Sequence, residues 1–218
     1  MLKKIIFLLF TIFFIHINAQ ITVMIDPAGD SKNVGRKLVE SYERSITFKL
    51  AEKLKQKLHE KYDYNCVLTK YQGEEVIELQ NASFANRLNV DLYLSLHVFR
   101  HEFAKPKLFL YNLIRNRLVD FAVRSTDPFK FVSVSQSHYL NINKTKVYVE
   151  SIKNYFGRKE YANKFDFYGV FGIPIKSLVG ITAPAVAIEI GLCNEDQLDF
   201  FVEPIVESLN FLYQEVIS

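Results

Sequence analysis

The chain has 218 residues, of which 49% are hydrophobic and 23% charged, so it is long and apolar enough for one domain with a substantial core. Its formal net charge is +3, and falls to +1 without the first nineteen residues, which argues against nucleic acid as the main partner. The two cysteines, Cys66 and Cys193, lack the CxxC spacing of zinc ribbons and redox motifs. We expect them to be small buried side chains on separate elements, and a disulfide between them in an oxidising compartment is the alternative.

The chain begins with the pattern of a secretory signal peptide. A basic start, MLKK, precedes the apolar run IIFLLFTIFFI and the small-residue ending INA. An uncleaved membrane anchor is the alternative, although the run is shorter than the ~20 residues of a membrane span. We therefore expect cleavage after Ala19, so that residues 1–19 are the signal peptide and residues 20–218 form an exported domain with no membrane attachment.

Strand and helix patterns alternate along the next part of the chain. Apolar runs predict strands at 21–26, 64–70 and 90–98. Apolar positions that recur every three or four residues predict helices at about 38–62 and 74–88. This alternation favours an α/β fold with a largely parallel sheet.

The remainder of the chain is less regular. The stretch KPKLFLYNL, residues 105–113, predicts a strand, and the following residues mix aromatic and polar side chains, with some helix expected near 138–155. The run APAVAIEIGL, residues 183–192, predicts a buried strand, and residues 194–217 predict a closing helix. Pro204 is expected near the start of that helix, or at a kink in it.

Four polar side chains interrupt these apolar elements. Asp26 ends the first strand, Glu43 lies on the apolar stripe of the first helix, and His97 and Glu189 lie near the carboxyl ends of two strands. Open α/β sheets bind ligands at that edge, and imidazole with carboxylates suits zinc, so the pattern favours a zinc hydrolase. The alternatives are a histidine satisfied by its neighbours and a strand glutamate in a buried ion pair with Arg or Lys.

The order of several motifs resembles the zinc-dependent N-acetylmuramoyl-L-alanine amidases of the amidase-3 type, which trim bacterial cell walls. IDPAGDS is similar to their first-strand loop, which contains DPGHGG, and the later matches are ERSITFKLAEKLKQKL, LTK, NASFANRLNVDLYLSLHVF and PAVAIEIGLCN. The matches cover residues 21–99 and 183–213 in order. The resemblance implies a mixed, largely parallel central sheet with helices on both faces (phosphorylase/hydrolase-like), and an amidase-like catalytic domain with an insertion at about 105–181.

The resemblance also assigns roles to individual residues. It makes Glu43 and His97 zinc ligands and Glu189 the catalytic base that activates a zinc-bound water. The family's first histidine ligand aligns with Gly29, which has no side chain, and this departure leaves a zinc site one ligand short. Asp30 is the candidate third ligand, with a loop-capping or solvent-facing role as the alternative.

The function implied is that of an exported, periplasmic or cell-wall-associated bacterial enzyme, with zinc as cofactor and peptidoglycan as partner. The bond cleaved is the amide between N-acetylmuramic acid and L-alanine of the stem peptide. The replacement at Gly29 keeps a second interpretation open, in which a catalytically impaired amidase-like module binds peptidoglycan or a protein partner.

Overall fold

The computed structural model describes residues 20–77, 79–114 and 133–217, and the predicted signal peptide and part of the insertion lie outside them. In chain order the strands are β1 (Thr22–Pro27), β2 (Asn65–Leu68), β3 (Leu92–Arg100), β4 (Lys107–Leu113), β5 (Asp166–Ile173) and β6 (Ala185–Leu192). The α-helices are α2 (Glu43–Tyr62), α3 (Gln80–Leu88), α4 (Ile142–Phe156) and α5 (Asp199–Ile217). Short 3-10 helices occur at Val134–Asn141, Lys159–Tyr161, Lys176–Leu178 and Glu195–Leu198.

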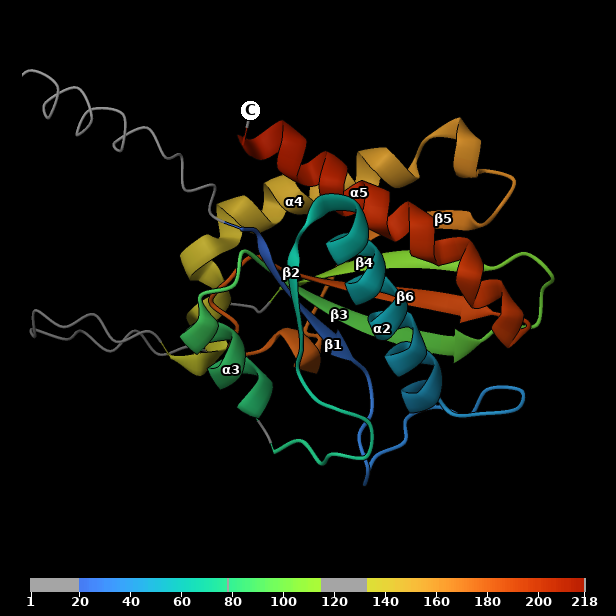
Figure 1. The fold of residues 1–218 in the computed structure, drawn as a ribbon, viewed down its shortest axis with the longest axis horizontal. Coiled ribbons are helices and arrows are strands. Elements are labelled where there is room, and N and C mark those ends of the chain that lie inside the picture. The colour runs from blue at the N-terminus through green and yellow to red at the C-terminus, as the bar shows by residue number, and fades with distance from the viewer. Residues whose placement is uncertain (1–19, 78, 115–132, 218) are drawn as a thin grey trace, which may run out of the picture.

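The six strands form one mixed sheet in the order β2-β1-β3-β6-β4-β5. Neighbouring strands run parallel except β4 and β6, which pair antiparallel (Figure 1). The central strands β1, β3 and β6 all end at the same edge, so side chains from distant parts of the sequence meet there. The predicted mixed, largely parallel sheet is confirmed.

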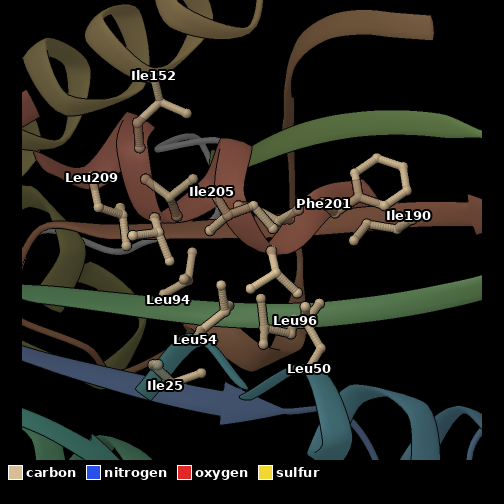
Figure 2. Packing of buried hydrophobic residues seen from close by; sticks show 14 of the residues in the cluster. Ile25, Leu50, Leu54, Leu94, Leu96, Ile152, Ile190, Phe201, Ile205 and Leu209 are labelled. Carbon is tan, nitrogen blue, oxygen red and sulfur yellow. The ribbon is translucent and has the colours of Figure 1, made fainter. Parts of the chain in front are cut away.

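Alternation along the strands divides the core into two layers. One layer joins β1, β3 and β6 to α2, α4 and α5 through aliphatic side chains that include Leu94, Leu54 and Ile205 (Figure 2). The other layer packs Ala82 and Ala85 of α3 against the opposite face of the sheet. Helices therefore cover both faces of the sheet, as the sequence predicts. Within the described ranges, no helix has the length and apolar character needed to cross a membrane.

Three elements differ from the predictions. The first long helix begins at Glu43 rather than near residue 38, because Leu38 and Ser41 form a turn and residues 37 and 42 pair as an isolated bridge. The second begins at Gln80, six residues late. The insertion contributes β5, an edge strand that the pattern did not predict, beside β4.

The end of the chain follows the prediction more closely. The Asn194 side chain accepts a hydrogen bond from the backbone N–H of Asp196 and forms a capping box with Gln197. Pro204 lies in the second turn of α5, near the start of the helix as predicted, and its missing N–H removes one hydrogen bond of that turn. Both cysteines are free thiols. Cys66 is buried on β2 as expected, whereas the expectation is wrong for Cys193, which is only partly buried and follows the end of β6.

Candidate functional site

Three of the four predicted site side chains meet at the carboxyl edge of the sheet. His97 on β3 is the register partner of Glu189 on the neighbouring strand β6, and their side chains lie on the face of the sheet against which α3 packs, beyond the buried Tyr93 and Ala187. Glu43 is the first residue of α2, and its Oε1 lies 3.5 Å from His97 Nδ1. The helix N-terminus supports a carboxylate at this position.

Arg36 lies between the two carboxylates. Its Nε and Nη2 donate to Glu43 at 3.1 and 2.8 Å, and its Nη1 donates to Glu189 Oε1 at 2.7 Å. Backbone N–H groups of Arg36 and Val98 also donate to the Glu43 carboxylate, each at 3.1 Å. Glu43 is only 4% exposed, so these donors replace the water that its charge would otherwise require.

The electrostatics of this cluster keep Glu43 and Arg36 ionised. Burial on its own would raise the pKa of Glu43, but hydrogen bonds from His97 and Arg36 outweigh it and hold the pKa of the carboxyl well below its usual 4.5. Burial also acts to lower the pKa of Arg36, whereas the two carboxylates raise this pKa above its ordinary value. The guanidinium thus neutralises charge that the fold has taken out of water.

Hydroxyl groups complete the hydrogen bonding of His97 and of Glu189. Tyr111 on β4 donates to Glu189 Oε2 at 2.7 Å, and burial together with this carboxylate raises the pKa of the phenol. The hydroxyls of Ser95 and Ser177 lie 3.1 and 3.3 Å from His97 Nε2. Both ring nitrogens of His97 therefore face polar neighbours, and Nδ1 is the one directed at Glu43.

Asp30 does not join this group. Its Oδ1 accepts hydrogen bonds from the backbone N–H groups of Lys32 and Asn33, at 2.9 and 2.7 Å, and the Asn33 bond is the main reason that the pKa of Asp30 is lowered. The side chain thus caps its own loop, which is the alternative that the sequence left open. Its role as a third metal ligand remains a prediction.

The loop is built around Gly29, the position that the resemblance described above aligns with a histidine. Gly29 has φ +81°, and a Cβ placed on it would lie 2.9 Å from Cβ of Arg44. A side chain is therefore disfavoured at this position by both backbone strain and lack of space. An imidazole could enter this loop only if the backbone took a different path.

A zinc ion can be tested against these residues. Two ligand atoms of one tetrahedral zinc ion lie roughly 3.3 Å apart, given bonds of about 2.0–2.1 Å. The 3.5 Å between Glu43 Oε1 and His97 Nδ1 fits such a pair. Across the described part of the chain, no group of three or more His, Cys, Asp or Glu side chains is arranged to hold a metal ion. Glu43 and His97 thus fit as two zinc ligands, but among the described residues no third ligand lies beside them. The Glu43 carboxylate is also hydrogen-bonded to Arg36.

Asp26 is linked to His97 through a hydrogen-bonded network. Its carboxylate accepts hydrogen bonds from the side chains of Lys70, Asn81 and Thr69, at 3.0, 2.8 and 2.7 Å. Ser95 bridges Asp26 and His97, at 3.4 and 3.1 Å. A cleft of about 680 Å³ lies beside these groups, and its lining includes Asp26, Asp30 and His97 but neither Glu43 nor Glu189. The cleft thus meets the site at His97.

Sequence reasoning did not identify Arg36 or Tyr111. The pattern did contain a signal for Arg36, because a glutamate on a core-facing stripe needs a cationic or hydrogen-bonding partner. It did not say which of the 27 Lys and Arg residues supplies that partner. Alternation along residues 105–113 places Tyr111 and Phe109 on one face of a strand. It does not predict which strand lies next to that one.

Comparisons with known proteins identify the family and the fold. The family model described as N-acetylmuramoyl-L-alanine amidase (amidase-3) matches residues 23–207. No curated protein sequence matches the chain.

Solved structures share the fold. The catalytic domain of CwlV, an N-acetylmuramoyl-L-alanine amidase from Bacillus (Paenibacillus) polymyxa var. colistinus, superposes with a TM-score of 0.64 at 18% identity, over 90% of this chain and 99% of that one. The CwlD amidase from Clostridioides difficile, in complex with the GerS lipoprotein, gives 0.64 at 13% identity, over 89% and 99%. An N-acetylmuramoyl-L-alanine amidase from Clostridium difficile gives 0.59 at 20% identity, over 91% and 99%.

The fold and the family match together define the class. The chain belongs to the amidase-3 family of N-acetylmuramoyl-L-alanine amidases, since the family model covers most of its length. Amidases of this family act on peptidoglycan and are generally zinc-dependent.

Proposed function

We propose that the mature chain is an exported peptidoglycan amidase that cleaves the bond between the lactyl group of N-acetylmuramic acid and L-alanine of the stem peptide. The observation that carries this proposal is the meeting of Glu43, His97 and Glu189 at one edge of the sheet. Family membership and the candidate signal peptide, residues 1–19, support action at the cell wall, in the periplasm or on the wall itself.

In this proposal Glu189 is the catalytic base. Amide hydrolysis needs a group that takes a proton from the attacking water and returns it to the leaving nitrogen, and a partly exposed carboxylate beside His97 suits both steps. Tyr111 orients Glu189 by donating to Oε2, which leaves Oε1 for the water once Arg36 releases it. The cleft beside His97 offers space for the stem peptide.

Zinc dependence is part of the same proposal. Glu43 and His97 are the residues that would hold the ion, with Asp30 as the third ligand if its carboxylate turns away from the N–H groups that it now caps. A bound zinc ion would supply a Lewis acid for the scissile carbonyl and lower the pKa of water. Glu43 is already ionised for this role, because its pKa lies well below the usual value.

The test combines product analysis with one substitution. We expect the purified mature chain with zinc to release free stem peptides from purified muropeptides, detected by mass spectrometry. Glu189→Gln should reduce turnover by at least ~100-fold, since a positioned acid–base group contributes 10²–10⁴-fold. Zinc should bind at least as tightly as in the wild type, because Glu189 is not one of the proposed ligands. Wild-type chain that releases no stem peptide at any zinc concentration would refute amidase activity.

A second candidate function is a catalytically impaired module that binds peptidoglycan or a protein partner, although the family match and the structural neighbours do not favour it. Arg36 engages both Glu43 and Glu189, so the carboxylates needed for hydrolysis are committed to an ion pair in this arrangement. A binding module would sediment with insoluble cell-wall sacculi and leave their stem peptides attached. If the chain stays in the supernatant, or releases peptides, this second function fails.

A further inference from the structure

The guanidinium of Arg36 takes the place of a cation at the candidate site. It contacts both oxygens of Glu43 and one oxygen of Glu189, with N···O distances of 2.7 to 3.1 Å. The carboxylates carry two negative charges, and the side chains of Glu43 and Glu189 are only 6% and 18% exposed. A buried pair of like charges requires a counter-ion, and here the chain supplies its own.

The atoms engaged by Arg36 include one that the proposed zinc site needs. Glu43 Oε1 accepts from Arg36 Nη2 at 2.8 Å, and the same oxygen lies 3.5 Å from His97 Nδ1. An ion bonded to Oε1 and Nδ1 at about 2 Å would lie against a guanidinium that is already within hydrogen-bonding distance of that oxygen. Because both are cations, their occupancies exclude one another.

The backbone near Arg36 is fixed while the end of its side chain is accessible. The Arg36 N–H donates to Glu43 Oε2, and the Glu43 N–H donates to the Arg36 carbonyl at 2.8 Å. Gly35 has φ +75°, and a Cβ there would lie 2.8 Å from Cβ of Glu43, so only glycine lets the loop approach this closely. The Arg36 side chain is 45% exposed, so it has a path to solvent, and leaving the site would break the bonds to both carboxylates and the contact with the Phe99 ring, whose centroid lies 5.6 Å from Cζ.

The geometry points to Arg36 as an internal competitor for the metal: the guanidinium and a divalent cation occupy the same place, and the cation binds only when Arg36 swings out. This inference rests on the proposed function for the identity of the metal, zinc. It goes beyond that function because it makes Arg36 a determinant of metal affinity. It also predicts that the metal-free chain is held in an ordered, ion-paired state.

The test measures zinc affinity without substrate. Wild type, Arg36→Met and Arg100→Met are titrated with zinc at pH 7 against a chromophoric chelator. Methionine keeps much of the length of the arginine stem and removes the charge. Arg100→Met is the matched control, because Arg100 is an exposed arginine three residues beyond His97 on the same strand. We expect Arg36→Met to bind one equivalent of zinc at least tenfold more tightly than wild type, and Arg100→Met to stay within twofold of it.

A double variant tests whether the gain in zinc affinity arises at the site that contains His97. Arg36→Met combined with His97→Ala should return the affinity to the wild-type level or below, because it removes one of the two ligands. If Arg36→Met gains no affinity, or if the gain survives the loss of His97, the competition inference is refuted.

Folding is checked by circular dichroism and thermal unfolding. If Arg36→Met does not fold, Arg36→Lys replaces it, because lysine keeps the charge but cannot bridge two carboxylates as a fork. We expect zinc to bind Arg36→Lys at least threefold more tightly than wild type, and unchanged affinity in that variant refutes the inference. Since no substrate is present, failure of amidase activity leaves this result intact, and unchanged zinc affinity leaves the amidase proposal standing.

Discussion

Glu43→Gln tests how much the buried carboxylate contributes to the fold. The substitution preserves size but removes the negative charge that accepts hydrogen bonds from Arg36 and from the Val98 backbone. It also turns an amide NH₂ toward groups that are themselves donors. Removing one partner of a buried ion pair costs about 3–5 kcal/mol. Because Arg36 is half exposed and keeps Glu189, we expect a loss near the lower end, about 3 kcal/mol at pH 7.

The assay is equilibrium urea unfolding of the metal-free mature chain. Glu52→Gln is the control, because Glu52 is an exposed glutamate of the same helix, and substitutions at such positions usually change stability by less than about 0.5 kcal/mol. If Glu43→Gln lowers the free energy of unfolding by less than about 1 kcal/mol, the effect equals that of breaking a surface ion pair. That result would refute the argument that the Glu43 carboxylate is buried and depends on its hydrogen-bond donors.

Three further predictions concern pH, a hydrogen-bonded loop and the cysteines. Because the pKa of Glu43 is depressed in the folded chain, its contribution to stability is complete above the usual value of 4.5 and is lost as the pH falls further. The stability difference between wild type and Glu43→Gln should therefore shrink between about pH 5 and pH 3 in urea titrations, and a constant difference would contradict this sign. Asn86 accepts two hydrogen bonds from Thr182 and donates one to the carbonyl of residue 180. Asn86→Ala should therefore lower the free energy of unfolding by about 2–3 kcal/mol in the same assay. A decrease under about 0.5 kcal/mol would show that these bonds are not stabilising. Burial raises the pKa of the Cys66 thiol to about 12, whereas Cys193 is partly exposed. A thiol reagent at neutral pH should therefore modify Cys193 first and Cys66 only after unfolding. Equal rates of modification would indicate that β2 opens readily.

Much of the site could be predicted from local patterns. Alternation along residues 90–98 and 183–192 placed His97 and Glu189 on the faces opposite the aliphatic core, and the helical stripe placed Glu43 toward the sheet. These assignments depend only on side-chain periodicity, which each segment carries in its own sequence. That β3 and β6 are neighbours depends on long-range pairing, and it entered through the resemblance to amidases.

The features that sequence reasoning missed depend on tertiary contacts. Arg36 lies in a loop without periodicity, and its importance comes from two carboxylates that are 7 and 153 residues away. The edge strand β5 contains Gly169 and Gly172, which weaken the strand pattern, and it is defined by pairing with β4. Residues 38–42 have a composition that permits helix, but the turn at Leu38 and the bonds between Arg36 and Glu43 fix the first helical residue.

The account rests on the claim that Glu43, His97 and Glu189 surround one cation position, now held by Arg36. Anomalous diffraction at the zinc edge, from crystals of the mature chain at saturating zinc, tests it most directly. We predict a peak about 2 Å from Glu43 and His97, with the Arg36 guanidinium turned toward solvent. A peak elsewhere, or none while Arg36 still bridges the two carboxylates, would contradict the claim.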